Sequence, residues 1–83
     1  MVEGFSAVRA AIVELIQRGQ KAGQVRADVE PDAAARAMIA IFQGLVLQLA
    51  WGEDLDLAAC GRMIRSMIRN SLLTDAAVAL NPA

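Results

Sequence analysis

Few side chains in this sequence could carry out acid–base or nucleophilic chemistry. The 83 residues include no histidine and a single cysteine, Cys60. A Ser–His or Cys–His pair is therefore impossible, and the common zinc sites lack their ligands. Three carboxylates cluster at Glu53, Asp54 and Asp56, but acidic residues before a helix are explained more simply as caps than as an acid–base pair. The sequence predicts no enzyme, no cofactor and no metal site.

Three arginines and two glutamines remain as candidates for binding a ligand. Arg62, Arg65 and Arg69 fall on one side of a predicted helix. A basic stripe without aromatic residues or a basic loop beside it is more often solvated, or paired with nearby acidic residues, than bound to phosphate. Gln43 and Gln48 interrupt an apolar stretch, where they could bond to a ligand or to each other across a symmetric interface.

Composition narrows the class of protein. Eight basic and nine acidic residues give a net charge of −1, which favours neither nucleic acid nor an anionic membrane as a partner. A chain this short buries only about 60% of the surface that its unfolded form exposes. A lone cysteine excludes an internal disulfide, so association with another chain is the stabilising device left. The lone cysteine and the lack of a secretory signal predict a cytoplasmic protein.

Three helices are predicted to position these residues, within a single all-α domain that spans residues 1–83. Apolar residues with helical spacing predict helices over about 3–21, 31–51 and 55–73. Pro31 suits the first turn of the second helix, and Asp54 or Asp56 can cap the third. The Ala-rich segment 74–83 could extend the third helix, form a short helix of its own or lie along a neighbour.

The second predicted helix is apolar on nearly every side, since residues 37–51 carry no charge. A helix of this kind needs cover on two faces, yet the uncharged stretch falls short of the ~20 residues that span a bilayer. One face holds large residues, which are expected to build the core with the other two helices: Met38, Ile39, Phe42, Leu45, Val46 and Leu49. The opposite face holds Ala33, Ala37, Ala40 and Gly44, and Leu47 and Trp51 continue it.

The small face predicts contact with a second copy of the chain. Glycine in mid-helix costs about 1 kcal/mol relative to alanine, so Gly44 indicates a close helix crossing, or else relieves crowding inside the chain. The third helix carries a second strip of small or adaptable residues beside its apolar side, and Cys60 on that apolar side is expected to be a buried structural thiol. The predicted homodimer interface consists of Ala33, Ala37, Ala40, Gly44, Leu47, Gln48, Trp51, Ala59, Met63, Ser66 and Asn70.

Several short motifs follow one another along residues 15–57. A turn of the pattern Gly-Gln-x-x-Gly-x-hydrophobic-Arg-x-Asp runs over residues 19–28, and the acidic-Pro-acidic start of the next helix is Glu30-Pro31-Asp32. That helix carries the pair Gly44-Leu45, and an acidic turn and a final amphipathic helix come after it. From about Phe5 to Leu73, the sequence resembles the C-terminal domain of TetR-family transcriptional regulators.

The resemblance implies that the three helices are the last three of such a regulator. They would be antiparallel, and the second and third would pair with their counterparts in a second subunit as a four-helix bundle. In the family, earlier helices help to line a pocket for a small inducer. A small apolar ligand is therefore expected only if the rest of the domain is present, with Met38, Phe42 and Leu45 as candidate remnants of the pocket.

The family's DNA-binding helix-turn-helix lies N-terminal to the part that this sequence covers. We therefore expect a truncated regulator, or a piece of a longer one, that dimerises as a homodimer and binds no nucleic acid and no membrane by itself. The alternative is a stand-alone small helical module for protein–protein interaction. Mass measurement of the product made in its own cells would distinguish the two.

Overall fold

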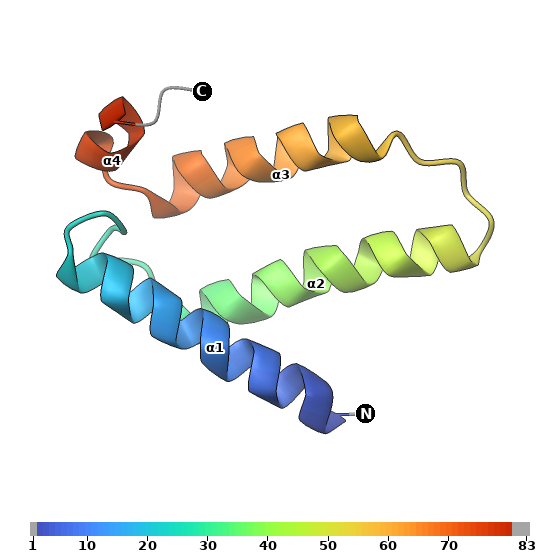
Figure 1. The fold of residues 1–83 in the computed structure, drawn as a ribbon, viewed down its shortest axis with the longest axis horizontal. Coiled ribbons are helices and arrows are strands. Elements are labelled where there is room, and N and C mark those ends of the chain that lie inside the picture. Colours follow the sequence, from blue (N-terminus) through green and yellow to red (C-terminus); the bar gives the residue numbers. More distant parts are fainter. Residues whose placement is uncertain (1, 81–83) are drawn as a thin grey trace.

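The computed structural model describes residues 2–80, and the side chains of residues 5–80. It contains four helices, α1 (Val2–Lys21), α2 (Pro31–Ala50), α3 (Leu57–Leu72) and α4 (Asp75–Leu80) (Figure 1). The described residues form no strand, so the all-α class is confirmed. The tail forms a short separate helix, one of the three conformations considered for it, and residues 81–83 lie outside the described residues.

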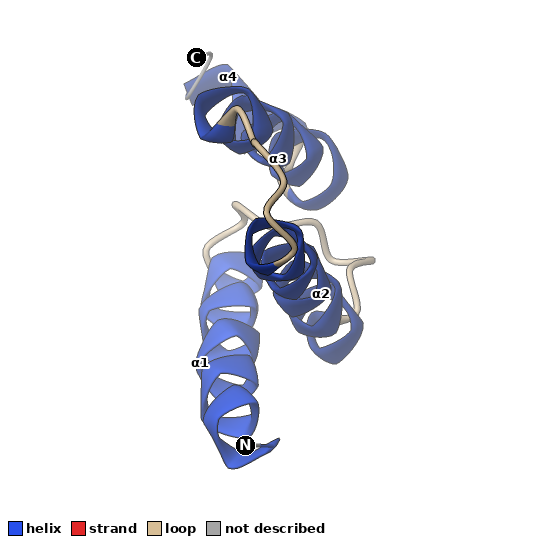
Figure 2. Cartoon of the chain, turned by 90° about the vertical axis from the view of Figure 1, so that its right-hand side faces the viewer, coloured by secondary structure: helices blue, strands red, loops and turns tan. Residues whose placement is uncertain are grey.

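The four helices form a thin slab rather than a globule (Figures 1 and 2). Its extents are 40 × 31 × 14 Å, so its thickness is less than half of either other dimension. The radius of gyration is 14.2 Å, compared with about 12 Å for a compact domain of this length. Domains are normally built from two packed layers around a core, and this chain supplies little more than one.

The principal packing within the slab joins α1 to α2. Ala35 of α2 is fully buried, and Ile16 of α1 is 5% exposed. The α3 helix runs back alongside α2 but stands away from it (Figure 1), and an apolar cavity of about 370 Å³ lies between them. Apart from Ile16 and Ala35, only Ala77 is a buried hydrophobic residue in the part of the chain that the structure describes.

The prediction that the large face of α2 is buried in a core is wrong for three of its residues. Phe42 is 60% exposed, and Val46 and Leu49 are each 48% exposed. The reason is geometric, because α1 runs along the first half of α2 and diverges from the second half (Figure 1). Because α3 lies at a distance from α2, the other side of this face is exposed as well (Figure 1).

Capping interactions set where α2 and α3 begin. The Glu30 carboxylate accepts hydrogen bonds from the backbone N–H groups of Asp32 and Ala33, at 2.8 and 3.2 Å. Asp56 rather than Asp54 caps α3, and its carboxylate accepts the N–H of Ala59 at 3.0 Å. Both caps satisfy N–H groups that the first turn of a helix leaves without an intrahelical partner.

The residues of the motif Gly-Gln-x-x-Gly form the turn after α1, and each of the three defined positions has a structural role there. A Cβ atom at Gly19 would lie 2.5 Å from Val25 Cγ2, so this position has no room for a side chain. The Gln20 amide donates to the carbonyls of Arg26 and Val29, at 3.1 and 2.8 Å. Gly23 has φ +76°, which an L side chain rarely adopts. The motif residues therefore shape the connection between α1 and α2.

The same turn also holds the end of α3. Arg26 N–H donates to the Leu72 carbonyl at 2.7 Å, and Thr74 N–H donates to the Gln24 carbonyl at 2.9 Å. The Thr74 hydroxyl donates to the Gly23 carbonyl at 2.9 Å, and it accepts the Ala77 N–H in the first turn of α4. The end of α3 and the start of α4 are therefore fixed to the α1–α2 turn by main-chain and hydroxyl bonds.

Among the described helices, α2 is long and apolar enough to cross a membrane by length and composition alone. The full helix has 20 residues, more than the uncharged stretch considered from the sequence. A single helix of this kind is weak support for a membrane span, since a core helix of a soluble protein passes the same test. Its first turns also carry the ionised pair Asp32 and Arg36.

Candidate interaction surface

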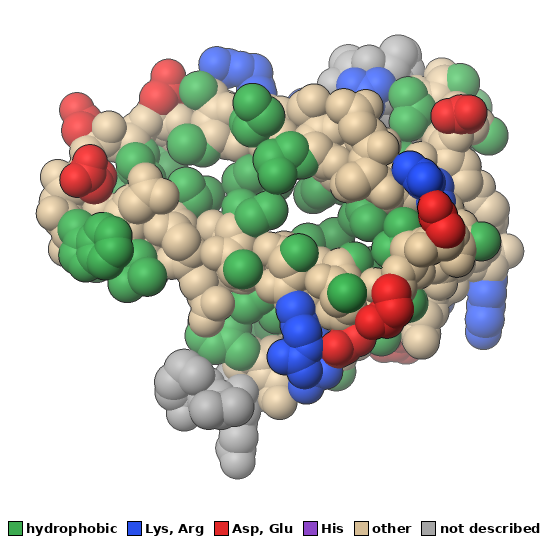
Figure 3. Space-filling view, turned by 180° about the vertical axis from the view of Figure 1, so that it is seen from behind, with side chains coloured by type: hydrophobic (Ala, Val, Ile, Leu, Met, Phe, Trp, Pro, Cys, Tyr) green, Lys and Arg blue, Asp and Glu red, His purple; other side chains and the backbone are tan. Residues whose placement is uncertain are grey.

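The small residues of α2 lie on the side of that helix turned away from α1. Ala33, Ala37 and Ala40 are exposed, and Gly44 is partly exposed. Further along the same face, Leu47 is 51% exposed and Trp51 is 71% exposed. Seen from behind, the slab shows hydrophobic side chains gathered over both α2 and α3 (Figure 3). The structure therefore leaves this face of α2 exposed, and its first part, with Ala33 and Ala37, also lines the cavity between α2 and α3.

Gly44 has no crowding to relieve inside the described chain. A Cβ atom built on Gly44 finds nothing within 4 Å, in contrast to Gly19. Internal crowding was one of two explanations for a glycine in the middle of this helix, and the structure offers no atoms that would cause it. The helix-propensity cost of about 1 kcal/mol therefore has no compensation within the described chain.

The strip predicted on α3 is also accessible. Met63 is 62% exposed, Ser66 and Asn70 are exposed, and Ala59 is partly exposed. The Asn70 amide donates to the Ser66 hydroxyl at 3.4 Å, one turn earlier on the same helix. These side chains present a mixed small and polar surface beside the apolar side of α3.

The chain as a whole exposes more surface than a compact monomer would. Its accessible surface is 5960 Å², whereas a folded monomer of 8.8 kDa is expected to expose about 4,800 Å². The difference of roughly 1,200 Å² exceeds the ~800 Å² that each partner buries in a standard protein–protein interface. The large hydrophobic residues that are exposed are Val8, Leu15, Phe42, Val46, Leu47, Leu49, Trp51, Leu57, Met63, Met67 and Leu80.

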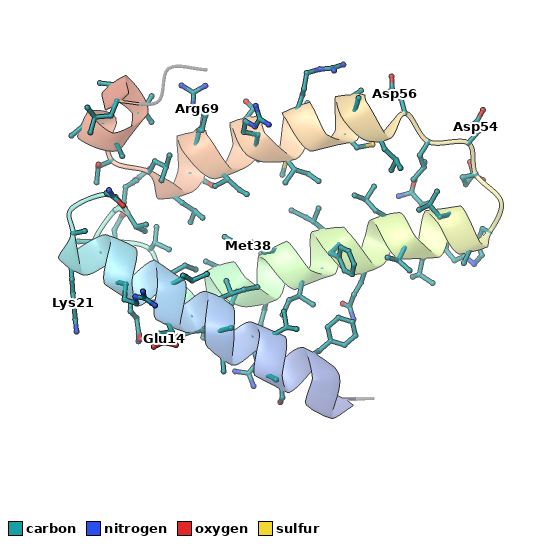
Figure 4. The ribbon with its side chains drawn as sticks, viewed as in Figure 1. Glu14, Lys21, Met38, Asp54, Asp56 and Arg69 are labelled. Atoms are coloured by element: carbon teal, nitrogen blue, oxygen red, sulfur yellow. The ribbon has the colours of Figure 1, made fainter. Side chains whose placement is uncertain are left out.

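Two of the three candidate remnants of a ligand pocket lie together. Met38 and Phe42 line an apolar cavity of about 330 Å³ between α1 and α2, with Phe5, Val8, Ile12 and Ile39 around them. Met38 also reaches the cavity between α2 and α3 (Figure 4). Leu45 is partly buried and does not line the cavity that Met38 and Phe42 share.

An ion-pair cluster at the crossing of α1 and α2 was missed from the sequence. Asp32 accepts one bond from Arg9 of α1 and one from Arg36 of α2, both at 2.8 Å. The bonds from Arg36 and Arg9 hold the pKa of the Asp32 carboxyl below its ordinary value of 3.8. The i,i+4 spacing of Asp32 and Arg36 was a readable signal, but the contribution of Arg9 depends on how the helices cross.

Of the remaining candidates, Arg69 lines a cavity of about 620 Å³ together with Arg26, Asn70 and Thr74. Arg62 and Arg65 are exposed, and no described ion pair includes them. Arg69 lies on the side of α3 that faces away from α2 (Figure 4), and its Nε is buried without a partner. Cys60 is half-buried rather than buried. No group of three or more potential metal ligands occurs among the described residues.

Comparison with known proteins places these features in a family. No curated protein and no solved structure matches the chain. A family model described as "BetI-type transcriptional repressor, C-terminal" matches residues 2–73, which include the turn, α2 with its exposed small face, and α3. The match confirms the TetR resemblance read from the turn motif, and the chain belongs to the family of BetI-type transcriptional repressor C-terminal domains.

Proposed function

We propose that this chain is the dimerisation part of the C-terminal regulatory domain of a TetR-like transcriptional repressor, with the DNA-binding helix-turn-helix in another part of that repressor. The observation that carries the proposal is the open small face of α2, with Gly44 at its centre. The excess exposed surface gives a second line of support, because it is large enough to be one half of a stable interface.

In the proposed assembly, α2 and α3 pack against the same helices of a second copy across a two-fold axis, as a four-helix bundle. A two-fold interface is isologous, so one open surface serves both partners. Small residues allow the backbones to approach closely, which raises the number of dispersion contacts. The proposed interface residues are Ala33, Ala37, Ala40, Gly44, Leu47, Gln48, Trp51, Ala59, Met63, Ser66 and Asn70.

Trp51 is the proposed anchor of the interface. It is 71% exposed at the end of α2, beside the turn at Gly52, which has φ +83°. Tryptophan is enriched at interfaces because its ring buries a large apolar area while its N–H finds a polar partner. A ring left in water at the end of an apolar face is consistent with burial against a second copy.

Substitution of Gly44 by leucine tests the proposal. Gly44→Leu should weaken the dimer by about 1–3 kcal/mol, because it overpacks a close helix crossing, and sedimentation equilibrium would show a fall in mass at low concentration. Gly61→Leu is the matched control, since Gly61 is also a helical glycine with nothing within 4 Å of a built Cβ and lies outside the proposed interface. An unchanged mass for Gly44→Leu, or an equal fall for both variants, would contradict the proposal.

The proposal assigns no catalysis, no cofactor and no direct DNA contact to this chain, and it places the repressor in the cytoplasm. The arginines of α3 are too few and too isolated to hold a duplex, since phosphate contacts supply most of the affinity of DNA-binding proteins. The family match favours a regulator over the stand-alone interaction module that the sequence also allowed. Its contribution to repression is to hold two subunits together so that both DNA-binding parts act at once.

A further inference from the structure

We propose that a basic pocket at the crossing of α1 and α2 binds the carboxylate of a small organic acid. This crossing pocket has a volume of about 330 Å³ and lies beside the ion-pair cluster of Asp32. It is lined by Phe5, Ser6, Arg9, Arg36, Ile39 and Gln43.

The charges around the crossing pocket leave an excess of one positive charge. Arg9 and Arg36 share a single acidic partner, Asp32, through one bond each at 2.8 Å. A guanidinium carries five N–H donors, so most donors of both arginines remain free for other acceptors. No acidic residue lines the pocket among the residues whose side chains the structure describes. The surplus charge therefore matches a monoanion.

Asp32 also holds the two guanidinium groups in place before any ligand arrives. Each of its two oxygens accepts from a different arginine, which ties α1 to α2. The Arg36 side chain is 64% exposed and the Arg9 side chain 31%, so both remain reachable from solvent. Fixing long side chains beforehand lowers the entropy that binding would otherwise cost.

The other lining residues favour an organic acid over a bare inorganic ion. Phe5 and Ile39 provide an apolar wall, while Ser6 and Gln43 add a hydroxyl and an amide with no hydrogen bond to another described residue. Guanidinium groups match the planar fork of a carboxylate. Small-molecule sites range over about 300–1,000 Å³, so a pocket of this size suits an acid with one ring or a short chain.

Every contact in the proposed site lies within one chain, so the proposal is independent of dimerisation. The probe for the test is benzoate, whose ring can pack on Phe5, and the matched neutral probe is benzamide. Isothermal titration should show benzoate binding at least about tenfold more tightly than benzamide, because hydrogen bonds to charged groups are the stronger ones. Added salt should weaken benzoate binding and leave benzamide unaffected.

Substitutions of residues that line the crossing pocket test whether benzoate binds there. Arg36→Gln should weaken benzoate binding about tenfold or more, whereas Arg65→Gln, which removes an exposed arginine of α3, should leave it unchanged. Gln43→Met serves as a second test in case Arg36→Gln disturbs folding, because the Gln43 side chain is exposed and makes no hydrogen bond to another described residue. It should weaken benzoate binding severalfold and leave the helical circular dichroism unchanged.

Three results would overturn the proposal. Equal binding of benzoate and benzamide would show an apolar site without a role for charge. Equal losses for Arg36→Gln and Arg65→Gln would show general attraction to the surface. A fall in dimer mass for Arg36→Gln, without any effect on benzoate binding, would show that Arg36 meets an acidic side chain of a second copy instead.

Discussion

At Gly19, the chain folds back on itself so tightly that no side chain fits. The Val25 side chain occupies the place of a Cβ atom, and the neighbouring Gln20 amide spans the turn by bonding to two carbonyls. Gly19 and Gln20, which belong to the motif that resembles the family, therefore stabilise the local backbone conformation. They determine the path from α1 to α2.

Substitution of Gly19 by alanine should destabilise the fold by about 1 kcal/mol or more, because Val25 is stiff at its branched Cβ and overpacking costs roughly 1–3 kcal/mol. Where a helical glycine has no neighbouring atoms, the change to alanine stabilises the helix by up to about 1 kcal/mol. Gly61 is such a position, so Gly61→Ala should stabilise the fold. Urea unfolding at fixed protein concentration measures both. A Gly19→Ala variant as stable as Gly61→Ala would show that Val25 moves aside without cost.

Single residues were predictable where their role is local. Capping chemistry within a few residues of sequence predicted Asp54 or Asp56 at the start of the third helix, and the structure places Asp56 there. Arg9 was not predictable, because its contact with Asp32 spans 23 positions and depends on the crossing of two helices. The crossing pocket was missed for the same reason.

At the scale of elements, α1 and α2 form the closest pair, and Asp32 joins them. Arg36 and Arg9 lower the pKa of Asp32 from 3.8, so the ionised carboxylate stabilises the folded chain. Because the folded pKa lies below the unfolded one, this contribution is fully present above the unfolded pKa. It is lost as the pH falls below about 3.8, through the folded pKa.

The Asp32→Asn variant should therefore be less stable than the parent chain at about pH 7, and the difference should shrink below the ordinary carboxyl pKa. Urea unfolding over a series of pH values, at fixed protein concentration, measures this difference. Asp54→Asn is the control, since Asp54 makes no hydrogen bond to another described residue. A difference that stays constant down to about pH 2 would rule out Asp32 as the titrating group.

The helices could be read from the sequence, but their packing could not. Apolar spacing, Pro31 and the acidic caps are local signals, and they led to helices close to those of the structure. The burial of Phe42, Val46 and Leu49 was inferred from their shared face, which assumes that neighbours cover it. Where α1 diverges and how far α3 stands from α2 are set by long-range geometry, which the periodicity of one helix does not contain.

At the scale of the whole molecule, the chain is a slab 14 Å thick with little interior. Three buried hydrophobic residues among those described cannot supply much of the burial that offsets the loss of conformational entropy on folding. The predicted need for a partner followed from chain length and hydrophobic content. The slab shape of the chain depends on how the helices pack, so it could not be predicted from the sequence.

If folding and association are coupled, the melting temperature should rise with protein concentration, because binding to the native state stabilises it by mass action. Thermal unfolding followed by circular dichroism over about a hundredfold range of concentration measures this. The Gly44→Leu variant should melt at a lower temperature at each concentration. A melting temperature independent of concentration would mean that the single slab is stable without a partner.

The bonds between the α1–α2 turn and Thr74 join residues far apart in the sequence, which predicts an order of folding. Gly23 and Thr74 are 51 positions apart, so their bond closes a long loop, and the entropy of closing it must be lost before the contact contributes any stability. The turn around Gln20 joins residues only six and nine positions apart. We therefore expect the hairpin of α1 and α2 to form before α3 docks onto the turn, so that a helix of the proposed dimer interface is the last to reach its place.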